Sequence, residues 1–217
     1  MDKIIIHIRP VEWTEGERYG LQIRVWGENP EVRIDWGDDS VKSFYGNEIE
    51  EYHTYPKNEF LQFKVEVTVI SGEVEFIDPC GGECDIEVID FSNAPSIKEI
   101  SVENCQNITL DNPNLEKLSV RIFNGRDIDL SKCPNLRQLS FEGGIDMTEI
   151  DLSGCHRLAR LEVDGSWQNP DFSKIVIAND APLKYVRLSS VNLSKGSVQF
   201  IQNLIHRNKG EIYIEMR

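Results

Sequence analysis

The stretch "IDLSKCPNLRQLSF", residues 128–141, is answered 22 residues later by "IDLSGCHRLARLEV", residues 150–163. In both stretches an aspartate, a serine and a cysteine precede apolar residues in the pattern LxxLxL. A pattern that returns at a nearly fixed spacing indicates stacked copies of one structural unit, because no single copy can bury its apolar side chains alone. The two stretches therefore predict a repeat architecture.

The apolar pattern occurs five times in the second half of the chain, with Leu, Ile, Val or Phe at its three positions. The first positions of successive copies are 18, 21, 22 and 25 residues apart. This spacing predicts one short strand per copy and a parallel sheet in which the pattern residues face the core. The five copies are Ile97/Ile100/Val102, Leu115/Leu118/Val120, Leu136/Leu139/Phe141, Leu158/Leu161/Val163 and Leu183/Val186/Leu188.

These copies resemble the leucine-rich repeats of bacterial surface and interaction proteins, in which "LDLSxCPxLxxLxV" units are common. The resemblance covers roughly residues 86–193 and implies a short solenoid. Residues 194–217 are expected to cap it, with one helix and the closing strand "EIYIEM". We expect Ser197 as the helix N-cap and Gly210 as its carboxyl-terminal stop. The apolar helix face comprises Val198, Ile201, Leu204 and Ile205.

The first 78 residues follow a different pattern, in which apolar and polar residues alternate between turn residues. Seven such runs predict a small antiparallel β-sandwich. "GLQIRVWG" and "VRIDWGD" are expected as separate strands, and so are "FLQFKVEVTVI" and "EVEFID". The predicted fold is thus mainly β, with a sandwich over residues 1–79 and a repeat domain of about five copies over residues 80–217.

Two motifs in the first half, "IDWGDDS" at 34–40 and "YHTYPKNEFLQFKVEVTV" at 52–69, resemble the PKD-type (polycystic kidney disease) immunoglobulin-like sandwich. Asp39 stands where that family usually has a second glycine, so the resemblance is to a variant. It implies that Trp36 and Tyr55 fill the core and that Asp38 ties down the turn.

Composition limits the partners. The net charge of −14 and the pI of about 4.7 disfavour nucleic acid and anionic membranes as partners, because both would repel the chain.

No apolar run approaches the roughly 20 residues that cross a bilayer, and the amino terminus does not resemble a signal peptide. As written, the chain is expected in the cytoplasm; if Met1 follows a removed export signal, the location is the cell surface or outside. The oligomeric state is open.

The cysteines have mainly structural interpretations. Cys133 and Cys155 occupy the slot that holds Ala94 and Ala181 in other copies, which predicts small buried side chains. Cys105 is also expected to be structural. "DPCGGECD", residues 78–85, contains Cys80 and Cys84, which are expected as free thiols in a linker, or as a disulfide if the chain is exported. The pair is a poor zinc signal.

Acidic residues and histidines are the candidates for cation-binding or catalytic sites. Asp90, Asp129 and Asp151 recur in the copies and either bind a cation or cap their own turns beside a serine, and capping is the favoured interpretation. The acidic turn of residues 35–39 is likewise a calcium candidate or a plain turn. No histidine lies in a catalytic motif. We therefore expect no enzyme, no cofactor and no metal site.

The solvent side of the predicted repeat sheet carries small and mixed-charge residues, which suits polar recognition. An insertion at residues 165–174 adds Trp167 and Phe172 as possible anchors. The sequence predicts a non-catalytic recognition or scaffold protein that binds a protein partner. Alternatives are a glycan-binding accessory protein of a bacterial surface system and an enzyme with an unrecognised site. The candidate binding residues are Arg121, Gln138, Glu142, Arg160, Glu162, Trp167, Tyr185 and Arg187.

Overall fold

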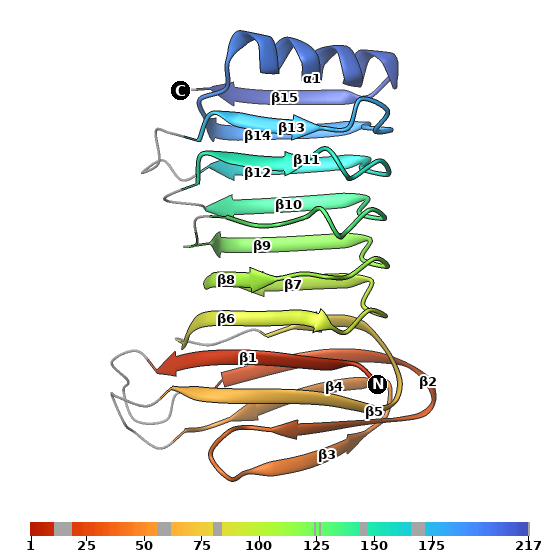
Figure 1. The fold of residues 1–217 in the computed structure, drawn as a ribbon, viewed down its shortest axis with the longest axis vertical. Helices are drawn as coiled ribbons and strands as arrows, with labels where there is room; N and C mark the ends of the chain where they lie inside the picture. The colour runs from red at the N-terminus through yellow and green to blue at the C-terminus, as the bar shows by residue number, and fades with distance from the viewer. Residues whose placement is uncertain are drawn as a thin grey trace. The chain divides into compact units, whose positions relative to one another are not determined.

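The computed structural model describes residues 1–10, 19–55, 62–79, 84–123, 125, 127–143, 147–165 and 172–216, except for the side chains of four residues at segment ends, Pro10, Cys84, Asp85 and Met216. These residues are mainly β, with 59% in strands, and include a β-solenoid of about six turns and a carboxyl-terminal helix followed by a strand (Figure 1). The chain divides into two compact units, Met1–Asn112 and Pro113–Arg217.

The first unit contains eight strands in its described residues. β1 lies between β5 and β6 in antiparallel pairing, and β2 pairs antiparallel with β3, β4 and β5. Two further pairs are parallel, β5 with β7 and β6 with β8. The strands are β1 (Lys3–Pro10), β2 (Tyr19–Asp35), β3 (Val41–Tyr45), β4 (Glu48–His53), β5 (Phe63–Asp78), β6 (Cys84–Asn93), β7 (Glu99–Glu103) and β8 (Cys105–Thr109).

β2 and β5 are each one long strand, and the expectation of two separate strands in each place was wrong. The pairing of β2 with β5 shifts register between Trp26 and Glu31, so the two strands turn a corner together. Two glycines meet at this corner: a Cβ on Gly27 would lie 3.0 Å from the Cα of Gly72. Because Gly72 has φ +95° and no side chain, the backbones can approach and bend without ending either strand.

The core of the first unit contains the residues that the PKD resemblance singled out. Trp36 and Tyr55 are 2% and 5% exposed, and the Tyr55 hydroxyl donates to the Trp36 carbonyl oxygen at 2.9 Å. Asp38 accepts from the backbone N–H of Ser40 at 3.1 Å and closes the turn. The expected roles of these three residues are confirmed. The predicted boundary at 79/80 lies inside this unit, because β6 pairs with β1 and β7 pairs with β5 across it.

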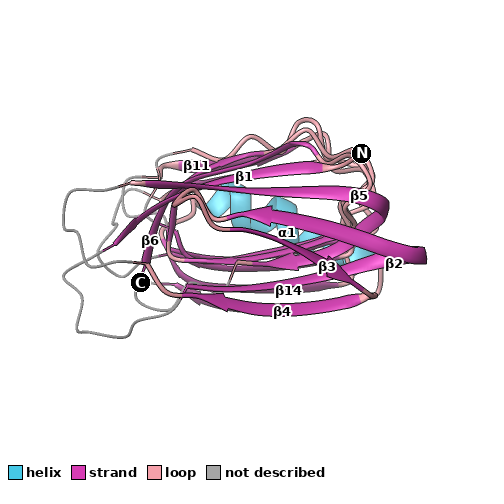
Figure 2. Cartoon of the chain, turned by 90° about the horizontal axis from the view of Figure 1, so that it is seen from below, coloured by secondary structure: helices cyan, strands magenta, loops and turns pink. Residues whose placement is uncertain are grey.

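The second unit is a parallel coil with two layers of strands. One layer is a sheet in the order β9, β10, β12, β14, β15, and the other is the pair β11 and β13. β11 and β14 lie on opposite sides of the coil (Figure 2). The strands are β9 (Lys117–Phe123), β10 (Gln138–Gly143), β11 (Glu149–Leu152), β12 (Arg160–Gly165), β13 (Lys174–Ile177), β14 (Tyr185–Val191) and β15 (Glu211–Met216).

The two coils that contain Cys133 and Cys155 turn into their strands through the same pair of hydrogen bonds. Cys133 donates its backbone N–H to the Leu130 carbonyl, and Leu136 donates to the Cys133 carbonyl. Cys155 makes the same pair of bonds in the next coil, and Ala94 does so in the first unit. Cys133, Cys155, Ala94 and Ala181 are all fully buried. The equivalence of cysteine and alanine at this position is therefore confirmed.

The helix α1 (Lys195–Arg207) covers the end of the coil with Ile201, Leu204 and Ile205, which are buried. Its N-cap is Ser194, whose hydroxyl accepts from the Ser197 N–H at 3.1 Å, so the expectation of Ser197 as N-cap was wrong. Both serines precede the same apolar face, and one turn of α-helix separates them. Helical geometry at Lys195 and Gly196 makes the earlier serine the cap.

Candidate functional site

The predicted binding residues that the structure describes lie on the exposed side of the β9–β15 sheet. Parallel pairing aligns them without a shift: Gln138 is opposite Arg160, which is opposite Tyr185, and Glu162 is opposite Arg187. Arg121 is exposed on β9, next to a register irregularity. The structure thus brings together Gln138, Glu142, Arg160, Glu162, Tyr185 and Arg187 on three neighbouring strands, whereas Trp167 lies outside the described residues.

The most developed part of this surface is the Tyr185 cluster, which we define as Arg160, Tyr185 and Tyr213. The Arg160 Cζ lies 3.9 Å from the centroid of the Tyr185 ring, and the Tyr185 and Tyr213 rings are 5.8 Å apart. Glu162 holds the guanidinium in place by accepting from the Arg160 Nε at 2.6 Å. The Tyr213 side chain is 55% exposed. Two aromatic rings and an arginine are therefore presented to solvent side by side.

Tyr213 was missing from the predicted site, although its strand was expected. In "EIYIEM" the isoleucines alternate with Glu211, Tyr213 and Glu215, and β15 continues the sheet in register, with Tyr213 opposite Arg187. Tyr213 is predictable if the rows of exposed residues on neighbouring strands are extended to this last strand. The Tyr213 hydroxyl donates to the Glu211 Oε2 at 3.2 Å, and this bond raises the pKa of the Tyr213 phenol because the neutral form is the donor.

A small hollow of about 140 Å³ lies beside the cluster, across β10, β12 and β14. Its polar lining consists of three carboxylates, two serines and one guanidinium. Such a hollow suits one polar or cationic group of a partner and is too small for an extended ligand. The polar residues are Ser140, Glu142, Glu162, Asp164, Arg187 and Ser189.

The recurring aspartates cap their own turns, as the favoured interpretation predicts. Asp90, Asp129 and Asp151 accept from the backbone N–H two residues later, at 2.8, 2.9 and 2.8 Å. Hydrogen bonds from Ser131 and Ser153 hold the pKa values of Asp129 and Asp151 below the ordinary value. In the acidic turn, Asp35 accepts from the Gly37 N–H at 3.0 Å. Within the described part of the chain, no three His, Cys, Asp or Glu side chains are grouped for a metal ion.

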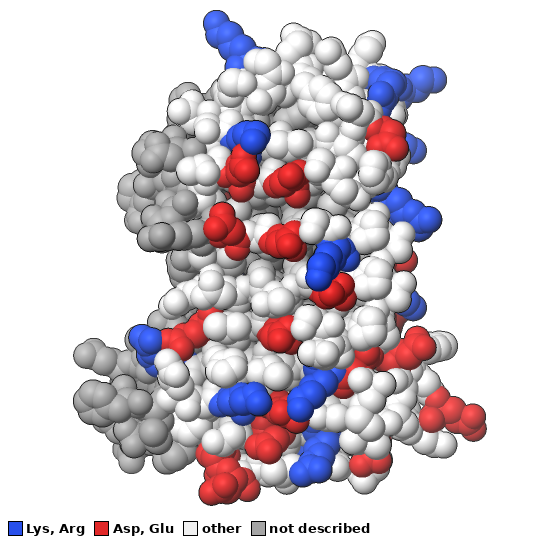
Figure 3. Space-filling model, viewed as in Figure 1, with Lys and Arg blue, Asp and Glu red and all other residues white. Residues whose placement is uncertain are grey.

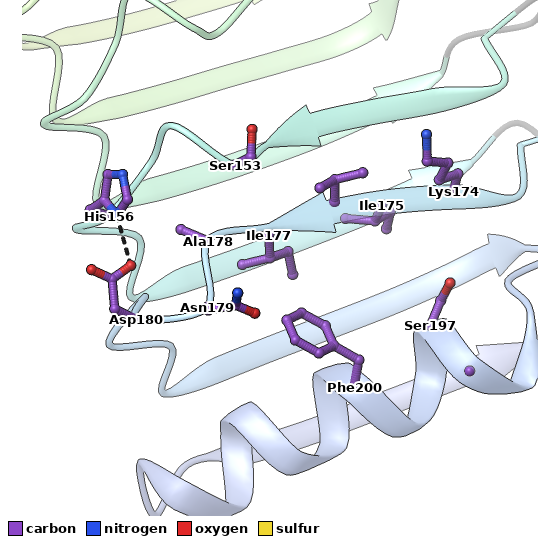
Figure 4. A pocket seen from close by; sticks show the side chains of 12 residues that line it. Ser153, His156, Lys174, Ile175, Ile177, Ala178, Asn179, Asp180, Ser197 and Phe200 are labelled. Atoms are coloured by element: carbon purple, nitrogen blue, oxygen red, sulfur yellow. Dashed lines mark hydrogen bonds and ion pairs between the residues drawn. The ribbon is translucent and has the colours of Figure 1, made fainter.

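A second and larger hollow lies in the other layer of the coil, between β13 and α1. This β13 groove has a volume of about 700 Å³, and its lining includes Val176, Ile177 and Phe200. Figure 4 shows Phe200 projecting from α1 into the gap beside β13, with His156 and Asp180 at one end and Lys174 and Ser197 toward the other. Figure 3 shows acidic side chains at the level of β11 and β13, with a basic side chain against one of them.

The β13 groove contains serine, histidine and aspartate, the residue types of a hydrolytic triad. The His156 Nδ1 and the Asp180 Oδ1 are 2.7 Å apart, but the two side chains are 59% and 70% exposed. Of the hydrogen bonds that the structure describes, none joins Ser153 to His156. Ser153 instead donates its backbone N–H to Asp151. A nucleophile needs a hydrogen-bonded base, so this arrangement does not activate Ser153.

His53 is the other histidine paired with a carboxylate. Its Nε2 lies 2.8 Å from the Asp38 Oδ2, and its ring stacks on Trp36 with centroids 4.8 Å apart. Partial burial opposes ionisation of Asp38, but the hydrogen bonds from His53 and Ser40 outweigh it and lower the pKa of the carboxyl. These contacts join the 35–40 turn to the end of β4, which is a structural role.

In the part that the structure describes, no helix has the length and apolar character needed to span a bilayer. Comparison with protein-family models, with curated proteins and with solved structures gave no significant match.

Proposed function

We propose that the chain is a non-catalytic recognition protein of the leucine-rich repeat type with a PKD-like amino-terminal part, and that it binds a protein partner through the exposed face of the β9–β15 sheet. The observation that carries the proposal is the Tyr185 cluster, in which Arg160 stacks on Tyr185 beside the exposed Tyr213. Tyrosine and arginine are enriched among residues that dominate binding energy at protein interfaces.

The surroundings of the cluster support the same proposal. Gln138, Glu142 and Arg187 are exposed around it and offer both charge signs, as the polar rim of an interface does. Their strands, β10 and β14, are each paired on both sides, so the surface is formed before a partner binds. Little ordering is then required on association, which favours affinity.

The test is affinity capture with the full chain as bait. Wild type is compared with the double variant Tyr185→Ala/Tyr213→Ala, and Tyr45→Ala is the matched control, because Tyr45 is 75% exposed and lies on β3 of the other unit. We expect proteins retained by wild type and by the control to be lost by the double variant. Equal retention by all three baits would contradict the proposal.

Glycan binding is a second candidate function, and one feature of the first unit favours it. A groove of about 380 Å³ crosses β2, β4 and β5 and is lined by Phe76 with Gln22, Arg24, Glu48 and Glu50. The Arg24 Cζ lies 5.3 Å from the centroid of the Phe76 ring, and Trp26, 71% exposed, lies two residues further along β2. Aromatic faces beside amide and carboxylate groups suit a sugar ring.

The glycan candidate is tested on a panel of immobilised glycans with wild type, Trp26→Ala and Phe76→Ala. We expect binding by wild type and a loss in one or both variants. Absence of binding across the panel would rule this function out and would leave the protein-binding proposal intact.

A further inference from the structure

β13 is an edge strand in the layer opposite the β9–β15 sheet. Among the residues that the structure describes, its one strand partner is β11, with Lys174 opposite Glu149 and Val176 opposite Asp151. A β-strand with a single partner presents unpaired backbone groups on its other edge. The free edge of β13 faces the β13 groove rather than a further strand.

The backbone hydrogen bonds identify which residues of β13 face the groove. Lys174 donates its N–H to the Thr148 carbonyl, and Ala178 donates its N–H to the Leu152 carbonyl. The backbone N–H and C=O groups of the even-numbered residues of β13 therefore point toward β11. In a parallel strand the N–H and C=O of one residue point to the same side and alternate from residue to residue. The N–H and C=O of Ile175 and Ile177 therefore point into the groove.

The opposite side of the groove is apolar. Phe200 projects from α1 toward β13, and its ring is half-buried (Figure 4). Val176 is also half-buried, whereas the side chains of Ile175 and Ile177 are buried in the core. A segment lying in this groove would contact main-chain groups on one side and the Phe200 ring on the other. That combination suits an extended peptide, which has backbone donors and acceptors along its length and side chains on alternate faces.

The charges of this layer select among peptides. Lys174 is neutralised by Glu149, with Nζ and Oε2 2.5 Å apart. Asp151 and Asp129 lie on the same layer in successive coils, and hydrogen bonds from the chain keep both carboxyls ionised. Asp180 adds a carboxylate at the far end of the groove, with Arg207 nearby. Glu149, Asp151 and Asp129 lie outside the groove, whose described lining has Asp180 as its carboxylate and Lys174 as its ammonium group. The preference therefore comes from the whole chain, which carries −14 and so attracts a basic segment and repels an acidic one.

We propose that β13 binds an extended basic peptide segment of a partner as an added strand, with Ile175 and Ile177 exchanging main-chain hydrogen bonds with the segment and Phe200 packing on one of its apolar side chains. This site is separate from the Tyr185 cluster, because the two lie in different layers of the coil. It provides a second interaction surface that does not depend on the proposed function of the sheet face.

The test uses a blocked six-residue peptide of alternating lysine and valine, with an alternating glutamate and valine peptide as the charge control. Amide hydrogen exchange of the full chain is measured with and without peptide. In the free protein, the N–H groups of Ile175 and Ile177 should exchange faster than that of Val176. The basic peptide should slow exchange at Ile175 and Ile177 by about tenfold or more when the site is saturated.

Single variants test whether the peptide binds in the β13 groove rather than elsewhere on the coil. Phe200→Ala should weaken the basic peptide by about tenfold. Ile177→Pro should also weaken it, because proline removes one N–H that points into the groove and none that bonds to β11. Tyr45→Ala is the matched control and should bind as wild type does, because Tyr45 is exposed on β3, outside both proposed binding surfaces.

Four results would overturn the proposal. The first is no binding of the basic peptide at millimolar concentration. The second is binding that leaves exchange at Ile175 and Ile177 unchanged. The third is binding that Phe200→Ala leaves intact. The fourth is equal binding of the acidic peptide. Circular dichroism of each variant shows whether the coil is folded, and the exchange measurement on wild type decides the question even if Ile177→Pro does not fold.

Discussion

The guanidinium of Arg160 lies over the ring of Tyr185, 3.9 Å from its centroid, although the two residues are 25 positions apart in the chain. The contact exists because β12 and β14 pair in exact register, with Arg160 opposite Tyr185. We expect the pair to contribute about 0.5 to 1 kcal/mol to stability. A double-mutant cycle with Arg160→Ala and Tyr185→Ala, followed by urea denaturation, measures the coupling. Purely additive effects would show that the stacking contributes nothing.

The corner of β2 and β5 gives a second prediction. A Cβ on Gly72 would lie 2.8 Å from the Val25 Cγ1 and 2.9 Å from the Trp26 carbonyl oxygen, in a backbone with φ +95°. We expect Gly72→Ala to lower the free energy of unfolding by about 2 kcal/mol or more. Gly46→Ala is the control, because Gly46 also has positive φ but nothing within 4 Å of the added carbon. Equal losses of unfolding free energy in the two variants would indicate that the crowding around position 72 costs no stability.

The contact between Asp38 and His53 predicts a dependence of stability on pH. The pKa of Asp38 is lowered in the folded protein, so the folded state favours the ionised carboxyl. This contribution is complete above the unfolded pKa of about 4, and it is lost as the pH falls through the folded value. Asp38→Asn should therefore destabilise the protein at pH 7 and have a smaller effect at pH 3. Thermal unfolding at both pH values measures the difference. An equal effect at both would exclude the ionised carboxyl as its source.

The buried thiols give a prediction about reactivity. Burial raises the pKa of Cys105 to about 12, and burial together with the nearby Cys133 and Asp151 raises that of Cys155 to about 12. At pH 8 roughly one such thiol in ten thousand is a thiolate, the form that reacts with alkylating agents. Alkylation followed by peptide mass mapping should leave both residues unmodified in the folded protein and modify them in urea. Rapid modification without urea would show that the coil opens locally.

The register of the parallel sheet could be predicted from sequence because one rule governs every coil. Residues such as Leu139 and Leu161 face the core, so their neighbours along each strand face the other side of the sheet. The row through Gln138, Arg160 and Tyr185 follows directly. The turn-capping aspartates could be predicted for the same reason. In both cases a local pattern is repeated, and its neighbours are copies of itself.

Features that depend on distant contacts were not predictable in this way. The glycines at positions 27 and 72 look like turn residues in isolation, and their role as a shared corner depends on a contact between two residues 45 positions apart in the chain. The β13 groove arises because a helix, rather than another strand, follows β13 in that layer. A local sequence pattern does not indicate whether a strand has a second strand as its neighbour. Of the junction cysteines, Cys80 and the side chain of Cys84 lie outside the described residues.

The turn that begins at Asp129, and the matching turn at Asp151, are closed by carboxylate and backbone hydrogen bonds within each coil, and the Cys155 Sγ adds one weak bond to the Cys133 carbonyl of the preceding coil. The carboxylate accepts from Ser131 in one coil and from Ser153 in the next, and the backbone bonds of the cysteine in each turn are equally local. A coil of 22 residues can therefore be deleted or duplicated without leaving a turn open. The length of such a chain changes by whole coils, and the number of coils sets the area of its exposed sheet.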